Sequence, residues 1–235
     1  MNENLSEPGM NSKWILSQRG QKNKIEVRRP YQWMLEKERR PNGRIEDTAI
    51  VFLSNKECSF KCLMCDLWKN TSDESVPPGA IPEQIEWALS RLPSARHIKL
   101  YNSGSFFDEK AIPHSDYQSI AGLVEPFETV IVECHPRLIG EKCLEFSDQI
   151  SGQLEVAIGL ETAHPEILAR LNKQMTLEDF KRGVDFLKRN SINSRAFILL
   201  RPPFMTEKEG IIWARKSIDF AFDCGVDSCT VIPVR

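Results

Sequence analysis

The sequence lacks the long apolar run that a membrane-spanning helix needs. None of its uninterrupted apolar stretches approaches the roughly 18–20 residues required to cross a bilayer. The first ten residues have no basic segment followed by an apolar one, so they do not resemble a signal peptide. A large charge of one sign is also missing: the formal net charge is −2, which gives no overall basic field for nucleic acid or an anionic membrane. We therefore expect a cytoplasmic protein with no membrane contact.

A disulfide framework and a zinc ribbon are absent as well. Seven cysteines are an odd number, in a chain too large to need disulfide staples. Three of them, Cys58, Cys62 and Cys65, lie within eight positions, which fits a metal site in a reducing compartment. The remaining Cys and His form no second close pair with zinc-ribbon spacing. The other four cysteines have no role that we can assign, and buried apolar thiols are the default for them: Cys134, Cys143, Cys224 and Cys229.

The composition of the chain changes near residue 48. Residues 11–48 carry ten Lys and Arg against five acids, a local charge of +5, with Trp14, Tyr31 and Trp33 among them. Such a segment can contact RNA, because Lys and Arg neutralise phosphates while aromatic rings stack on bases. The alternative is a solvated, partly helical cap over the core. We expect a basic N-terminal extension over residues 1–48 and a core domain over residues 49–235.

The core sequence alternates short apolar runs with helical stretches. Runs such as AIVFL and AFILL are nearly continuous in apolar residues, as in parallel strands that are covered on both faces. Thr176 and Thr206 each begin a capping box before a helical stretch. This alternation predicts a parallel α/β array. The last expected strand has no helix after it and would be an exposed sheet edge, so the core domain over residues 49–235 is expected to belong to the N-terminal portion of a longer protein. The six expected strands are 49–54, 97–102, 129–134, 154–160, 195–200 and 228–233.

The three close cysteines directly follow the first expected strand, in CSFKCLMC. A four-iron, four-sulfur cluster needs soft thiolate ligands. Spacings of three and two residues let one loop bind three irons and leave the fourth without a protein ligand, and such an open position allows chemistry. A structural zinc site is the alternative, and it needs a fourth protein ligand.

The motif resembles the signature of the radical S-adenosylmethionine (SAM) superfamily, and the resemblance extends over residues 49–235. It implies a partial, open, six-stranded parallel β/α barrel with a [4Fe–4S] cluster on Cys58, Cys62 and Cys65. It further implies reductive cleavage of SAM to methionine and a 5′-deoxyadenosyl radical, with an electron donor such as ferredoxin or flavodoxin. The residue before the third cysteine is commonly aromatic in this family. Here it is Met64, which can still cover the cluster with a polarizable side chain.

Further polar residues at strand ends match SAM-binding positions of the family. Glu133 and Glu161 end the third and fourth expected strands, where carboxylates can accept hydrogen bonds from ribose hydroxyls or an ammonium group. The run GLETAHPEILARLNKQMTLEDF resembles the group that contains the elongator catalytic subunit and the oxygen-independent coproporphyrinogen oxidase. That resemblance implies that Glu161 holds the ribose and Lys173 the SAM carboxylate, although Lys lacks the bidentate fork of the usual Arg. The segment expected to receive the SAM amino group is Asn102, Ser103, Gly104 and Ser105.

Within this group, the segments YNSGSFFDEKAIP, VECHPRLI, GLET and CTVIPVR are most similar to the archaeosine-biosynthesis radical SAM lyases. Those enzymes act on a lysine-modified 7-deazaguanine base in tRNA, so the resemblance implies a tRNA substrate. Two alternatives stay open: a radical SAM enzyme with a small-molecule substrate, and a non-catalytic iron–sulfur or zinc binding module. Phe106 and Phe107 can either wall the pocket or belong to the core.

Overall fold

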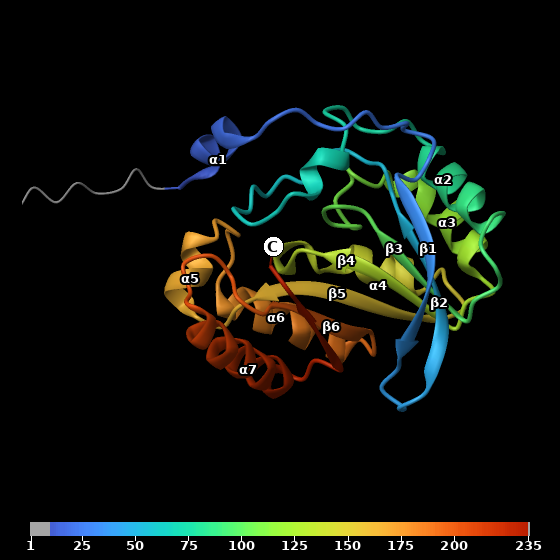
Figure 1. Ribbon diagram of the computed structural model, residues 1–235. Coiled ribbons are helices and arrows are strands. Elements are labelled where there is room, and N and C mark those ends of the chain that lie inside the picture. Colours follow the sequence, from blue (N-terminus) through green and yellow to red (C-terminus); the bar gives the residue numbers. More distant parts are fainter. Residues whose placement is uncertain (1–9, 235) are drawn as a thin grey trace, which may run out of the picture.

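The protein folds as one curled sheet with helices on its outer face (Figure 1). The computed structural model describes residues 10–234, so the expected N-terminal extension is described only from Met10 onward. Within this range the sheet has seven strands in the order β1 to β7. The strands are β1 Gln32–Arg39, β2 Ile45–Phe52, β3 His97–Tyr101, β4 Thr129–Cys134, β5 Gln153–Glu161, β6 Asn193–Leu199 and β7 Ser228–Ile232.

Strands β2 to β7 are parallel neighbours, which confirms the expected open parallel barrel. The sheet nevertheless has seven strands where six were expected, because β1 lies antiparallel to β2 and comes from the basic segment. The first expected strand also begins earlier, at Ile45 instead of residue 49. Strand β1 has no clear apolar alternation, since Glu36 and Glu38 face buried cations inside the barrel.

The helices follow the strands and cover the outside of the sheet (Figure 1). Both expected capping boxes are present, at Thr176 with Asp179 and at Thr206 with Glu209, and each satisfies amide groups of the first helical turn. None of the described helices is long and apolar enough to cross a membrane. The α-helices are α1 Ser12–Gln18, α2 Ala80–Leu89, α3 Tyr117–Val124, α4 Glu141–Ser147, α5 Pro165–Arg170, α6 Leu177–Arg189 and α7 Glu207–Cys224. Short 3-10 helices are η1 Leu67–Asn70, η2 His114–Asp116 and η3 Pro136–Leu138.

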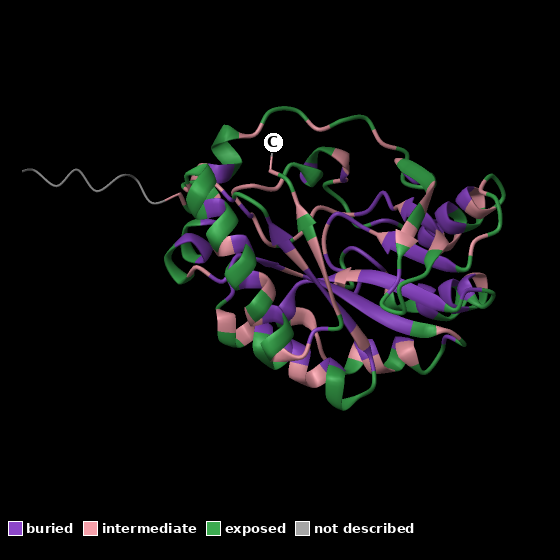
Figure 2. Cartoon of the chain, turned by 60° about the horizontal axis from the view of Figure 1, so that its bottom comes forward, coloured by how far each residue is buried: buried purple, intermediate pink, exposed green. Residues whose placement is uncertain are grey.

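The apolar core lies between the sheet and these helices. Alternate strand residues, such as Leu100, Val132 and Val156, are fully buried there, and the strands are the most buried part of the molecule (Figure 2). Phe106 and Phe107 belong to this core, where the Phe106 ring packs 4.9 Å from that of Phe146. The other face of each strand lines the interior of the half-barrel, which is where the polar residues converge.

Candidate active site

A cavity of about 590 Å³ occupies the interior of the half-barrel. Its size is in the usual range for cofactor and ligand sites. All the residues assigned from the sequence except Asn102 line it, together with residues of β1, β3, β6 and β7. The assigned residues that line the cavity are Cys58, Cys62, Met64, Cys65, Ser103, Gly104, Ser105, Glu133, Glu161 and Lys173.

The three cysteines lie on the loop between β2 and η1, and all three are free thiols. Burial raises the pKa of each thiol, that of Cys65 to about 11, while the nearby Lys173 ammonium acts in the opposite direction. The buried thiols therefore need a strong positive partner to become and stay ionised, which the iron of a bound cluster would supply.

The donor set fits a multinuclear cluster better than a single ion. Among residues 10–234, no three His, Cys, Asp or Glu side chains converge closely enough to hold one metal ion. A cubane makes no such demand, because each of its thiolates binds a different iron.

Backbone hydrogen bonds hold the cysteine loop against the α5–α6 connection. The Leu63 amide donates to the Leu171 carbonyl at 2.9 Å, and the Asn172 side chain donates to the Lys61 carbonyl at 2.7 Å. Met64 packs against a small cluster that includes Leu171 and Leu199. This packing leaves Met64 at the cavity wall.

The turn after β3 approaches the cysteine loop closely. Ser103 adopts a positive φ of 52°, and a Cβ added to Gly104 would lie 3.4 Å from the Cβ of Cys58. The Asn102 side chain is fully buried, makes no hydrogen bond to a described residue and does not line the cavity. It contributes through its amide, which donates to Glu133 Oε2 at 3.1 Å.

Glu133 is a partly buried carboxyl group near the end of β4. Burial raises its pKa to about 7, and the Asn102 amide and Lys173 only partly offset this effect. A carboxyl group with such a pKa can accept or donate a hydrogen bond near neutral pH. It faces the same cavity as the cysteines.

Glu161 and Lys173 were assigned separate ligand contacts, and the structure pairs them with each other. Lys173 Nζ lies 2.7 Å from Glu161 Oε1, with both side chains nearly buried. Burial opposes the charge of Lys173, but Glu161 and the Cys62 thiol outweigh it and raise the pKa of Lys173. Glu161 adopts a positive φ of 65°, at a register shift between β5 and β6, and this bulge turns its side chain toward Lys173.

His135 is a site residue that the sequence did not single out. Its ring stacks on Phe60 of the cysteine loop, with centroids 3.6 Å apart and planes 8° apart. Its Nε2 lies 2.9 Å from the Lys173 carbonyl. Burial, with Lys173 nearby, lowers the pKa of His135 to about 4, so the neutral ring donates its Nε2 proton to that carbonyl. The imidazole thus ties the cysteine loop to the segment that carries Lys173.

An ion-pair network forms the floor of the barrel beneath these residues. Glu155 receives hydrogen bonds from Arg195 at 2.6 Å and from Arg40 at 3.3 Å. Glu38 of β1 pairs with Arg195 and with Lys99. These contacts link β1 to β3, β5 and β6 across the interior, so the basic segment closes the floor of the half-barrel.

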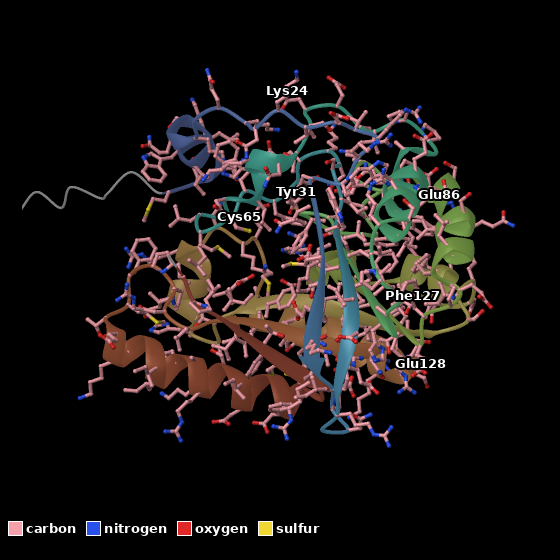
Figure 3. All side chains as sticks on the ribbon, turned by 45° about the vertical axis from the view of Figure 1, so that its right-hand side comes forward. Lys24, Tyr31, Cys65, Glu86, Phe127 and Glu128 are labelled. Atoms are coloured by element: carbon pink, nitrogen blue, oxygen red, sulfur yellow. The ribbon has the colours of Figure 1, made fainter. Side chains whose placement is uncertain are left out.

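The preceding part of the basic segment lies across the cysteine loop. Arg19 and Lys22 both pair with Glu57, the residue before the first cysteine, at 2.6 and 2.8 Å. Tyr31 reaches Ser103 Oγ at 3.2 Å, and Figure 3 shows it near Cys65 below the stretch that carries Lys24. This part of the segment therefore lies over the cysteine loop as a cap.

The fold is that of radical SAM enzymes. Methylornithine synthase matches with a TM-score of 0.57 and 14% identity, over 76% of this chain and 51% of that enzyme. The radical SAM methyltransferase TsrM from Kitasatospora setae, solved with cobalamin and a [4Fe-4S] cluster, matches with a TM-score of 0.54 and 15% identity, over 79% of this chain and 36% of TsrM. No family model matches the chain.

Three curated relatives match the sequence at 24% to 27% identity. An uncharacterised protein of Methanocaldococcus jannaschii is 27% identical over 204 residues, 80% of this chain and 56% of the relative. Archaeosine synthase subunit beta of Methanosarcina acetivorans is 26% identical over 206 residues, 81% of this chain and 60% of that subunit. Archaeosine synthase subunit beta of Thermococcus kodakarensis is 24% identical over 166 residues, 67% of this chain and 51% of that subunit. The chain thus spans between 51% and 60% of the length of these relatives.

Proposed function

We propose that the chain is the SAM-binding part of a radical SAM enzyme that modifies a tRNA base by archaeosine-type lyase chemistry. The observation that supports this most directly is the convergence in one cavity of three cysteines from one loop with Glu133, Glu161 and Lys173. A [4Fe–4S] cluster and SAM would together supply the one-electron chemistry that makes a 5′-deoxyadenosyl radical. An electron donor such as ferredoxin or flavodoxin is part of the proposal.

The residues of the chain have distinct tasks in this scheme. The three thiolates hold the cluster, and Met64 covers it from the side of the small apolar cluster. The Ser103–Ser105 turn brings backbone groups to the SAM amino group, because Gly104 lies almost against Cys58. The Glu161–Lys173 pair offers a carboxylate for ribose hydroxyls and an ammonium for the SAM carboxylate. His135 and the cap keep the cysteine loop in place.

The first experiment tests the cluster and SAM cleavage. Anaerobically reconstituted protein should bind about four irons and, when reduced, release methionine and 5′-deoxyadenosine from SAM. Replacement of Cys58, Cys62 and Cys65 by Ala should abolish both results. Cys224→Ala is the matched control, because Cys224 lies outside the cavity and should be replaceable without loss of iron. Iron retained by the triple variant would contradict the proposal.

The tRNA substrate rests on the likeness to archaeosine synthase subunit beta. Mass spectrometry of bulk tRNA nucleosides, with and without the gene, tests it directly. Loss of one modified nucleoside, restored by the intact gene and not by a Cys62→Ala copy, is the expected result. A gene product that cleaves SAM while the nucleosides stay unchanged would refute the tRNA assignment.

A small-molecule substrate is the second candidate, and one observation favours it. Cations of the basic segment that suggested RNA are paired within the chain: Arg19 and Lys22 with Glu57, and Arg28 with Glu83. Arg40 is only 8% exposed and bonds to Glu155 inside the barrel. These four cations therefore give little support for phosphate binding. The nucleoside comparison above separates the two candidates.

A further inference from the structure

The loop after β6 carries an exposed aromatic residue on a strained backbone. Phe204 adopts a positive φ of 75°, which a bulky side chain rarely does, and its residue is 40% exposed. Pro202 and Pro203 fix the chain before it, and the Thr206–Glu209 capping box fixes the chain after it. Strain of this kind persists only where the surroundings enforce it, and it is frequent at ligand contacts.

Two arginines lie near this ring. The guanidinium of Arg170, the last residue of α5, lies 3.6 Å from the centroid of Phe204. Arg201 lines a concavity of about 250 Å³ together with Phe204, Met205 and the two prolines. Both arginines are exposed, and neither forms an ion pair with any residue between 10 and 234. The nearby Glu209 carboxylate is already engaged by Thr206.

This group lies beside residues that form one wall of the active-site cavity. Leu199, at the end of β6, lines that cavity, and Met205 packs in the same small cluster as Met64. Phe222, on α7, is also exposed, at 50%, but no cation stacks on its ring. Position, unpaired charge and strain therefore distinguish Phe204 from an ordinary exposed apolar side chain.

We propose that Phe204, Arg170 and Arg201 form a contact site for an unpaired nucleotide of RNA. A base would stack on the Phe204 ring, and the two guanidiniums would meet the adjacent phosphates. RNA fits better than an apolar protein partner, because two free positive charges beside an aromatic face complement a base and its phosphates. The inference rests on the proposed RNA substrate and names where this chain would touch it.

The position of Phe204 allows a test that separates binding from folding. Phe204→Gly removes the ring but suits a positive φ, so its melting temperature should stay at or above that of the parent. Its affinity for a fluorescently labelled tRNA should fall by about 5- to 150-fold, the usual effect of losing one stacked base. Phe204→Trp keeps a stacking surface and should bind within about threefold of the parent. Phe222→Ala is the matched control and should bind tRNA as the parent does.

The arginines are tested through salt dependence. The double variant Arg170→Gln, Arg201→Gln should flatten the log–log slope of affinity against salt by about 1.4, because each single-strand phosphate contact contributes about 0.7. Arg189→Gln is the control, since Arg189 is exposed at the far end of α6. It should leave the slope unchanged.

Three results would overturn the inference. They are an unchanged tRNA affinity in Phe204→Gly, an unchanged salt slope in the double variant, and a shift of oligomeric state between parent and Phe204→Gly, which would make this surface a self-contact. SAM cleavage by the unsubstituted protein reports on the proposed function separately. A parent that binds tRNA through Phe204 but cleaves no SAM would refute the proposed function and support the contact site.

Discussion

Gly159 is the residue whose replacement should most sharply test the geometry of the SAM site. It lies in β5, and a Cβ added there would come within 2.5 Å of Lys173 Nζ and closer still to Glu161 Oε1. Both atoms are the ends of flexible side chains that line the cavity, so they can shift, but not without leaving their present positions. Gly159→Ala should therefore displace the ion pair without removing either charge.

The expected cost follows from this crowding. Because the two charged ends can shift into the cavity, the loss of stability should be smaller than the about 1–3 kcal/mol of overpacking a rigid core, and well below the about 3–5 kcal/mol of removing one partner of a buried ion pair. The hydrogen bonds that Glu161 and Lys173 would make to SAM are worth about 1.5–3 kcal/mol each, because they involve charged groups. Misplacing one of them should weaken SAM binding by about 10- to 150-fold. Iron content should remain that of the parent, since Gly159 does not touch the cysteine loop.

Isothermal titration of SAM into reconstituted, unreduced protein measures this loss. Gly122→Ala, in α3, is the control, because no atom lies within 4 Å of the added Cβ. In a helix interior this change should leave SAM affinity unchanged and raise stability by about 0.4–1 kcal/mol. SAM affinity within twofold of the parent in Gly159→Ala would show that the pair does not contact SAM.

Three further changes test the charges of the barrel. Glu155→Gln should lower the free energy of unfolding by about 3–5 kcal/mol in urea titrations, because Arg40 and Arg195 lose their shared buried carboxylate. The pKa of Glu133 is raised from 4.5 to about 7, so the folded protein holds this proton more tightly than the unfolded chain does. The melting temperature should therefore fall as the pH rises from about 4.5 to about 7. Glu133→Gln should remove this dependence of the melting temperature on pH. Glu57→Gln should accelerate iron loss. In the parent protein the pKa of Glu57 is lowered to about 2, so the stabilisation by Glu57 is present above pH 4.5 and declines as the pH falls toward 2.

An exposed ion pair provides the control for these charge changes. Lys37 and Asp47 pair at 2.9 Å on the surface of the β1–β2 hairpin. Asp47→Asn should change the free energy of unfolding by no more than about 1 kcal/mol. A similarly small effect of Glu155→Gln would show that the floor network does not stabilise the half-barrel. A pH slope that survives Glu133→Gln, or iron retained as in the parent by Glu57→Gln, would contradict the roles given to those residues.

The parallel strands and the cysteine loop could be predicted because their signals are local. Continuous apolar runs identify buried strands, and three cysteines in eight positions identify a ligand loop without knowledge of the rest of the chain. Strand β1 escaped prediction because its inward side chains, Glu36 and Glu38, are charged. Their partners, Lys99 and Arg195, lie more than sixty residues further along, so no short window contains both halves of the pattern.

The site residues show the same limit at closer range. Glu133 and Glu161 could be assigned to one cavity because each lies at the carboxyl end of a parallel strand, and these ends meet at one edge. Lys173, which follows α5, was assigned from the family resemblance of the run around it. The direct pairing of Glu161 with Lys173 could not be predicted, because it depends on a β-bulge and on the space that glycine leaves at position 159. His135 was missed for a related reason: a lone histidine has no motif, and its role arises only where Phe60 stacks on its ring.

The placement of the basic segment changes where RNA affinity must be sought. Four of its cations serve the chain itself: Arg19 and Lys22 neutralise Glu57, Arg28 pairs with Glu83, and Arg40 neutralises Glu155 in the barrel floor. A cation that is already paired releases few counterions when phosphate approaches, so these four add little to a salt-dependent affinity. Arg170 and Arg201, near Phe204, have no carboxylate partner among the described residues and retain that capacity, as do Arg29, Arg39 and Arg44 of the basic segment. The salt slope should therefore respond to Arg170 and Arg201 more than to the four paired cations of the segment that first suggested RNA.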